Sequence, residues 1–197
     1  MTLSLRERRR LETARHIQMK TLELAIQNSL ENITTEEISV AAGISTRTFF
    51  NYYTNKEAAA VGAPLPFRKE ALTTLEESNG PLADDIKSFL DQHMKLMTGD
   101  EPILNVVGKV MRPNEKVRGI MEEFLASQRE DLAASLEKRL NDRHAATALA
   151  SSVTDIIRRA IFVWEHTEQM SLNAALDIVW EGLITASTLL TTTPPRA

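Results

Sequence analysis

The sequence has 197 residues, of which 43% are hydrophobic and 25% charged, and a formal net charge of −4, which is typical of a soluble globular protein with one large domain or two small ones. It contains no cysteine, so disulfides, thiolate catalysis and Cys-ligated zinc are excluded. The sequence shows no signal peptide, and no apolar run approaches the roughly 20 residues that a membrane helix needs. We therefore expect a cytoplasmic protein without a membrane span.

The first ten residues are strongly basic, with four arginines between positions 6 and 10 against a single acid, Glu7. They predict a flexible basic arm that reaches DNA phosphates or the minor groove. A solvated helix start is the alternative. Residues 1–56 carry a balance of +2 and the rest of the chain −6, so positive charge gathers at this end, as attraction to phosphate requires.

A first helix is expected from about Leu11 to Asn28, with Ile17, Leu22 and Leu24 on its apolar face. This helix should pack against the segment that follows it and fix its orientation.

Two short helices joined by a tight turn are predicted between Thr34 and Lys56. Thr34 followed three residues later by Glu37 is a capping box, so the first of them begins there. Gly43 ends it, because a residue without Cβ adopts a positive φ freely. Ser45 then caps a second helix that runs to about Tyr53.

The short connection forces the two helices to cross steeply and predicts a helix-turn-helix, whose second helix enters the major groove of DNA. Arg47 suits guanine, Asn51 suits adenine, and Phe50 or the Thr46 methyl suits a thymine methyl. Donors that suit phosphates come from Thr48, Tyr52 and Lys56. An ordinary helical hairpin is the alternative. The residues expected to fill the crossing are Ile38, Ser39, Ala42, Ile44, Phe49 and Tyr53.

The stretch ISTRTFFNYYTNKE resembles the recognition helix and the start of helix four in the TetR family of transcriptional regulators, and the resemblance extends over about residues 10 to 60. It implies an all-α fold, in which an N-terminal three-helix helix-turn-helix DNA-binding domain is followed by a helical ligand-binding and dimerisation domain. No cofactor is implied. The candidate DNA-binding residues are Thr35, Ser45, Thr46, Arg47, Thr48, Phe50, Asn51, Tyr52 and Lys56.

The sequence departs from the family pattern at two positions. Phe50 stands where the family usually has Tyr, so a phosphate contact by that hydroxyl is lost and an apolar contact remains. Ser29 stands where a Gly usually follows helix one, which leaves Asn28 as the residue expected to adopt a left-handed conformation.

Gly62, Pro64 and Pro66 follow an alanine-rich stretch, and the prolines should end or kink helix four near Val61. This is the expected domain boundary, with residues 1–60 as the DNA-binding domain including its basic arm, and 61–197 as the effector-binding and dimerisation domain.

The remainder is helical by pattern. Two apolar helices, about 145–165 and 172–190, end the sequence and are expected to form a four-helix bundle with a second copy. The resemblance implies the same homodimer, although these helices could instead complete the monomer core. The tail Thr191–Ala197 is expected to be disordered. The other expected helices are Phe67–Glu77, Pro81–Met97, Glu101–Met111 and Pro113–Leu140.

In the family the second domain holds a ligand pocket, which predicts a small-molecule effector that is largely apolar. Met and aromatic side chains at helical spacing also suit a plain core. The candidate ligand-binding residues are Phe89, His93, Met94, Met97, Met111, Met121, Phe124, Phe162, Trp164 and His166.

No catalytic pattern is found: the four histidines lack metal-ligand spacing, and no Gly-rich phosphate loop or nucleophile elbow occurs. We therefore expect no enzyme, catalytic residue or metal site, although folding could still assemble a His and carboxylate cluster. The function predicted is a repressor that binds a palindromic double-stranded DNA operator as a homodimer and is released by an effector. The alternatives are an activator or a regulator without a small ligand, and a helical binding protein or enzyme that keeps the helix-turn-helix as scaffold.

Overall fold

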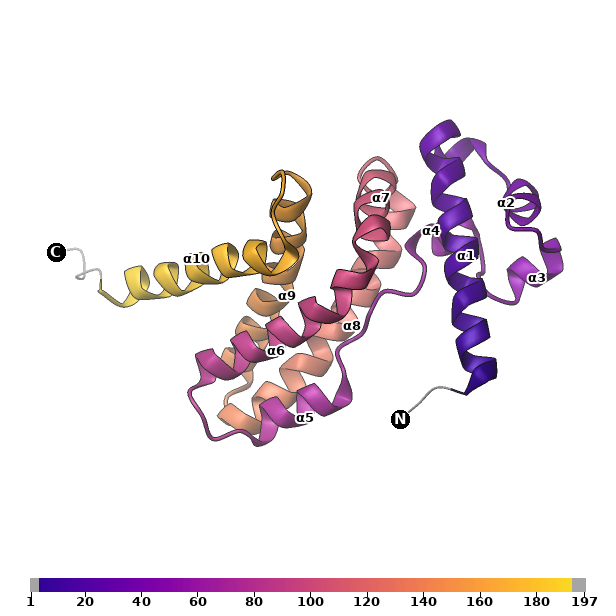
Figure 1. Cartoon of the computed structure of the whole chain (residues 1–197). Coiled ribbons are helices and arrows are strands. Elements are labelled where there is room, and N and C mark those ends of the chain that lie inside the picture. The colour runs from indigo at the N-terminus through magenta and orange to yellow at the C-terminus, as the bar shows by residue number, and fades with distance from the viewer. Residues whose placement is uncertain (1–3, 193–197) are drawn as a thin grey trace. The chain divides into compact units, whose positions relative to one another are not determined.

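The computed structural model describes residues 4–192 and is all-α, with about 81% helix and no strand among those residues (Figure 1). The predicted fold class is therefore confirmed. The helices are α1 Leu5–Asn28, η1 Leu30–Asn32, α2 Thr35–Ala41, α3 Thr46–Phe50, α4 Lys56–Val61, α5 Lys69–Glu77, α6 Leu82–Met97, η2 Thr98–Asp100, α7 Glu101–Met111, α8 Glu115–Leu140, α9 Arg143–Glu165 and α10 Leu172–Thr192.

The start of α1 differs from the flexible arm that its charge suggested. Ser4 caps the helix, since its Oγ accepts from the Glu7 amide and the Glu7 carboxylate accepts from the Ser4 backbone N–H at 2.8 Å. This capping box starts the helix at Leu5, so the expected arm is wrong for residues 5–10, which are helical. Residues 1–3 of that arm lie outside the described residues.

The end of α1 also corrects a prediction. Asn28 is its last helical residue, and Ser29 instead takes the positive φ, at 66°. Asn28 is held in the helix end, because its carbonyl accepts from the Asn32 side-chain amide at 2.9 Å. The reversal at Ser29 lets η1 start at once and bury Leu30.

The predicted turn chemistry between α1 and α4 is confirmed. Thr34 and Glu37 form the capping box of α2, Gly43 has a φ of +66°, and the Ser45 Oγ accepts from the Thr48 amide at 3.1 Å. Helix α3 is shorter than expected and ends at Phe50. The chain then turns so that Tyr53 is buried, with its hydroxyl donating to the Ala14 carbonyl at 3.0 Å.

Helix α4 ends at Val61, as predicted, and Gly62 follows it with a φ of +71°. The chain then continues without helix as far as Arg68, through both prolines. The absence of a backbone N–H donor in Pro64 and Pro66 explains why helix four does not continue.

By Cα packing the chain divides into two compact units. The first comprises the chain up to Leu65 together with Asp100–Leu125, and the second comprises Pro66–Gly99 together with the chain from Ala126 onward. Helix α8 thus contributes its first part to one unit and its remainder to the other. The division of function between residues 1–60 and 61–197 stays a prediction.

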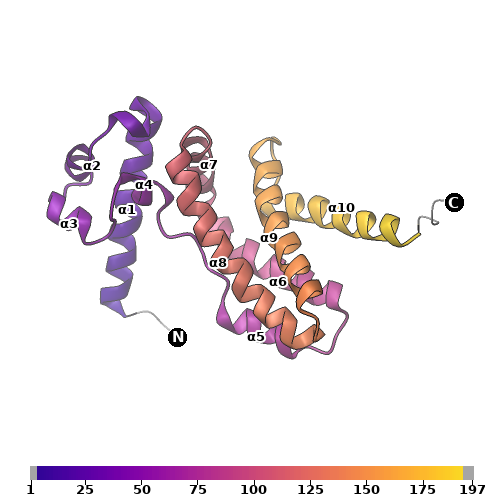
Figure 2. The same cartoon turned by 180° about the vertical axis from the view of Figure 1, so that it is seen from behind.

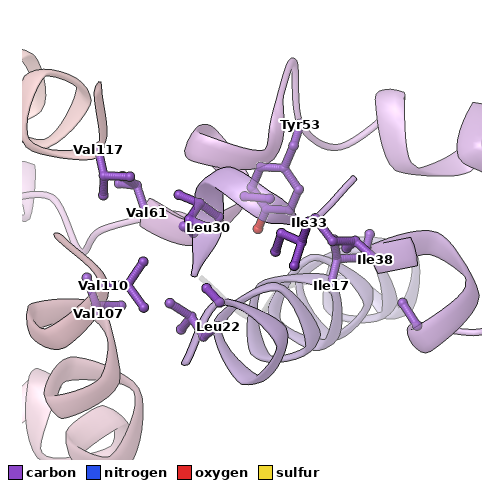
Figure 3. Close-up of a cluster of buried hydrophobic side chains, with 14 of the residues drawn as sticks. Ile17, Leu22, Leu30, Ile33, Ile38, Tyr53, Val61, Val107, Val110 and Val117 are labelled. Atoms are coloured by element: carbon purple, nitrogen blue, oxygen red, sulfur yellow. The ribbon is translucent and has the colours of Figure 1, made fainter. Parts of the chain in front are cut away.

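The core of the first unit joins the helix-turn-helix to α7 and the start of α8. Figure 3 shows Val107 and Val110 of α7 beside Leu22 of α1, with Val61 of α4 next to Val117 of α8. All five side chains are buried. Burial of one such side chain stabilises a fold by about 1.5–3 kcal/mol, so α7 is part of the core on which the helix-turn-helix rests.

The second unit contains α5, α6, the remainder of α8, α9 and α10. Its core is apolar and includes Leu90, Met94, Leu132, Leu136 and Leu176, all fully buried. The Arg139 side chain, only 9% exposed, donates to the carbonyls of Leu75 and Gly80 and to the Asp85 carboxylate, at 2.7–3.1 Å. This one cation ties α8 to α5 and α6.

Helix α10 is packed along only part of its length. Leu172, Ala175 and Leu176 are buried, whereas every side chain from Ile184 to Thr191 is exposed, including Leu190 at 84%. Figures 1 and 2 show the corresponding end of α10 extending past α9 without another described element of the second unit beside it.

Candidate nucleic-acid interface

Helix α3 presents one face inward and one to solvent. Phe49 is fully buried, and its ring contacts Phe50 edge-on at 5.4 Å and Tyr53 at 6.2 Å between centroids. Arg47, Phe50 and Asn51 are exposed. Because the buried ring fixes the helix, the three outward side chains have a rigid support.

Arg47 makes no hydrogen bond or ion pair within the described part of the chain. Its guanidinium keeps five donors in a fixed fork, which matches the O6 and N7 acceptors of guanine. Phe50 packs on Phe49 with one ring edge but leaves 53% of its surface exposed, which suits contact with a thymine methyl.

Three of the five hydroxyl groups in the candidate set already have partners inside the protein. The Oγ of Ser45 lies 2.8 Å from the Oγ1 of Thr48, and the Thr35 hydroxyl donates to the Glu36 carboxylate at 3.2 Å. Thr46 and Thr48 are half-buried. The hydroxyls of Ser45 and Thr48 therefore take part in capping α3, and each of them can still accept a further hydrogen bond.

Lys56 has a structural role that its sequence position did not suggest. Its Nζ donates to the backbone carbonyls of Glu31 and Ile33, both at 2.9 Å. These bonds join the start of α4 to η1 and to Ile33, the residue that follows it. An ammonium has three donors, so one N–H is left for the phosphate contact predicted for this lysine.

The sequence analysis did not predict that Arg10 contacts the end of α3. Its Nη2 donates to the Asn51 carbonyl at 3.3 Å, and its Cζ lies 5.1 Å from the centre of the Tyr52 ring. The available signal was spacing, since Arg10 lies seven residues before the buried Ile17 and so shares its helix face.

The candidate ligand-binding residues do not form a single cluster. Met111, Met121 and Phe124 belong to the first unit, where Met111 and Met121 pack against its core. The other seven belong to the second unit. There Phe89, His93 and Met94 are buried, Met97 and Trp164 are half-buried, and Phe162 and His166 are exposed.

His93 sits in an aromatic environment. Its ring lies 4.9 Å from that of Phe67, which also contacts Phe89 at 4.9 Å. Burial penalises the charged imidazolium and lowers the pKa of His93 to about 4. The side chain is therefore neutral at physiological pH.

One open hollow of about 520 Å³ lies on the second unit, and none of the ten candidate ligand-binding residues lines it. Its lining residues are Pro66, Phe67, Arg68, Lys69, Leu72, Gln128, Asp131, Ala134 and Ser135.

Among residues 4–192, no group of three or more His, Asp or Glu side chains is placed to hold a metal ion. The expectation that no apolar run approaches the length of a membrane helix is wrong for Leu172–Thr191, which is long and apolar enough to cross a membrane, with a mean hydropathy of 1.3. One such helix is weak support for a membrane span.

Comparison with known proteins agrees with the geometry of this site. Residues 19–59 match the family model described as bacterial regulatory proteins, tetR family. No curated protein matched the sequence.

Two solved structures share the fold. One is a protein from Syntrophomonas wolfei assigned to the TetR-family transcriptional regulators, with a TM-score of 0.65, 16% identity, and coverage of 90% of this chain and 95% of the other. The second, from Mesorhizobium loti and assigned to the same family, has a TM-score of 0.53, 14% identity, and coverage of 90% and 98%. Residues 19–59 thus match the tetR family model, and the chain as a whole shares the fold of these two TetR-family transcriptional regulators.

Proposed function

We propose that the protein is a transcriptional repressor that binds a palindromic operator as a homodimer and is released by a small, largely apolar effector. The observation that carries this proposal is the outward row on α3, where Arg47, Phe50 and Asn51 are exposed on a rigidly packed helix. A guanine contact, a methyl contact and an adenine contact in that order suit the major groove.

The proposed dimer uses α9 and α10, which contain the expected segments 145–165 and 172–190. Apolar side chains remain exposed on α10, including Ile178, Ile184, Leu189 and Leu190. Two copies of a helix-turn-helix placed about one helical turn of DNA apart contact two half-sites. A second copy covering α10 would remove the apolar surface from water and also supply the second recognition helix.

An effector site belongs to the second unit in this proposal, with His93 among the candidates. An effector that binds the DNA-incompetent state more tightly than the DNA-competent state would shift the protein toward the incompetent state. The size of the shift is set by the difference between the two affinities. In this proposal the protein acts in the cytoplasm and is not an enzyme.

The test of DNA recognition is selection of duplexes from a random pool by the full-length chain. We expect enrichment of an inverted repeat, bound with two chains per duplex and weakened by salt. If selected and random duplexes of equal length bind alike, the regulator proposal is wrong. Enrichment of a single half-site bound by one chain would instead contradict the dimer.

The effector is tested by melting the protein in the presence of a library of small apolar compounds. A true effector raises the melting temperature by mass action and lowers affinity for the selected duplex. A protein that binds its inverted repeat but responds to none of these compounds would favour a regulator without a small ligand.

A further inference from the structure

The face of α1 that packs against the helix-turn-helix continues beyond the hydrophobic core. Ile17 is fully buried on that face, and one turn earlier the Ala14 carbonyl accepts from the Tyr53 hydroxyl. Arg10 lies one further turn toward the helix start. Residues four and seven apart share a helix face, so Arg10 extends this contact surface toward the end of α3.

Arg10 contacts the turn that ends α3 in two ways. It donates from Nη2 to the Asn51 carbonyl, and its guanidinium lies over the Tyr52 ring. Asn51 is the C-cap residue of α3. A helix of only five residues has little stability of its own, so the contacts of Arg10 add to the packing of Phe49 in holding the backbone at Asn51.

We propose that Arg10 is a positioning residue for base recognition: it holds the Asn51–Tyr52 turn so that the Asn51 amide faces an adenine edge. This inference rests on the proposed DNA-binding function and assigns α1 a part in sequence selectivity. The basic start of α1 then acts as a fixed helical support and not as a mobile arm.

The chemistry of the guanidinium suits this role better than that of an ammonium. It is planar, so it can lie on the Tyr52 ring and direct one N–H to a carbonyl at the same time. A cation at the C-terminal end of α3 also offsets the partial negative charge of its last carbonyls. Lysine would keep the charge but lose the planar contact.

The test compares variants of the full-length protein on two probes, the duplex selected by the wild type and a random duplex of equal length. The ratio of the two dissociation constants measures base discrimination. Arg10→Ala and Arg10→Lys are compared with Arg8→Ala, a matched control that removes an exposed arginine on the opposite face of the same helix. Melting temperatures show whether each variant is folded.

We expect Arg10→Ala to lower the discrimination ratio on the order of threefold to tenfold, and Arg10→Lys to restore little of it. Arg8→Ala should leave the ratio within about twofold of the wild type, because phosphate contacts weaken both duplexes alike. In an Asn51→Ala background, Arg10→Ala should change the ratio no further, since coupled residues are not additive.

Full discrimination by Arg10→Lys would show that charge alone matters and would overturn the proposal. So would equal ratios for Arg10→Ala and Arg8→Ala, or an undiminished effect of Arg10→Ala when Asn51 is absent. A wild-type chain that selects no duplex would instead reject the proposed function itself, before any variant is compared.

Discussion

Gln18 of α1 donates its side-chain amide to the backbone carbonyl of Val61 at 2.9 Å, and the amide is almost fully buried. Val61 is the last residue of α4, and Gly62 follows with a φ of +71°. A Cβ on Gly62 would overlap the Gln18 amide. The side chain of one helix thus fixes both the end of another and the direction in which the chain leaves it.

We expect Gln18→Leu to lower the free energy of unfolding by about 1–3 kcal/mol, because the Val61 carbonyl loses its donor in a buried place. Gln27→Leu, at an exposed position of the same helix, should change it by less than about 0.5 kcal/mol. Urea unfolding measures both. Equal stabilities of the two variants would contradict the role given to Gln18.

Gly62→Ala should be destabilised by about 1–3 kcal/mol, since alanine is strained at this positive φ and overlaps Gln18. Part of that loss should disappear in a Gln18→Ala background, where the overlap is gone. A double-mutant cycle in urea measures the coupling. Strict additivity of the two substitutions would show that only the backbone conformation matters.

Arg47→Ala should weaken binding to the selected duplex by about 1–3 kcal/mol and relax base preference, because the guanidinium suits a base edge. The melting temperature should stay unchanged, since Arg47 has no hydrogen bond or ion pair in the described residues. Equal losses on selected and random duplexes, measured by fluorescence anisotropy, would contradict this role.

Lys56→Met should behave differently. It should weaken binding to all duplexes alike, as expected for a phosphate contact. It should also lower the melting temperature, because the carbonyls of Glu31 and Ile33 lose their donor. A variant with unchanged melting would show that these two bonds contribute little to stability.

Two neighbouring cations of α8 offer a matched pair. Arg139→Met should lower the free energy of unfolding by about 1–3 kcal/mol, because the carbonyls of Leu75 and Gly80 lose their donor and the half-buried Asp85 carboxylate loses one partner. Lys138→Met should cost less than about 1 kcal/mol, because its side chain is 66% exposed in its pair with Glu76. Chemical denaturation of both variants checks the difference.

His93 makes stability depend on pH. Its pKa falls from 6.5 to about 4 on folding, so the unfolded chain binds a proton that the folded chain does not. Stability should therefore be complete above pH 6.5 and decline by about 2–4 kcal/mol as the pH falls towards 4. His93→Phe should flatten this part of the profile in urea denaturation, whereas His16→Gln, at an exposed position, should not.

Leu189 is 61% exposed on α10. If this helix pairs with a second copy, Leu189→Glu should raise the dimer dissociation constant at least about tenfold, because a charge is then buried at the interface. Thr188→Glu lies on the face that carries Asp177 and Glu181 and should have little effect. Sedimentation equilibrium distinguishes the two, and an unaffected Leu189→Glu dimer would place the interface elsewhere.

Local signals predicted the helix-turn-helix well. The capping box at Thr34, the positive φ at Gly43 and the cap at Ser45 each depend on two or three neighbouring residues, so the sequence alone specifies them. The same reasoning found the end of α4 before the prolines and the limits of α7.

Features that depend on distant residues were not predictable in this way. The Lys56 bonds to Glu31 and Ile33 and the Arg10 contact with Tyr52 span 23 to 42 positions in the sequence. Ser29 took the positive φ expected of Asn28 because the next turn must begin at once to bury Leu30. Helical periodicity indicates which face of a helix is buried but not which other helix covers that face. The packing of α7 against α1 could therefore not be predicted from the sequence.

The core of the first unit is formed by residues far apart in sequence, which limits how this chain can be recombined with other proteins. A chimera joined after residue 60 would transplant the recognition helix but leave behind Val107, Val110 and Val117, which cover Leu22 and Val61. The transplanted piece would carry an uncovered apolar surface and would be prone to aggregate. A portable DNA-binding module from this chain must therefore be assembled from two separate stretches of sequence, or be given a redesigned surface where the second stretch is missing.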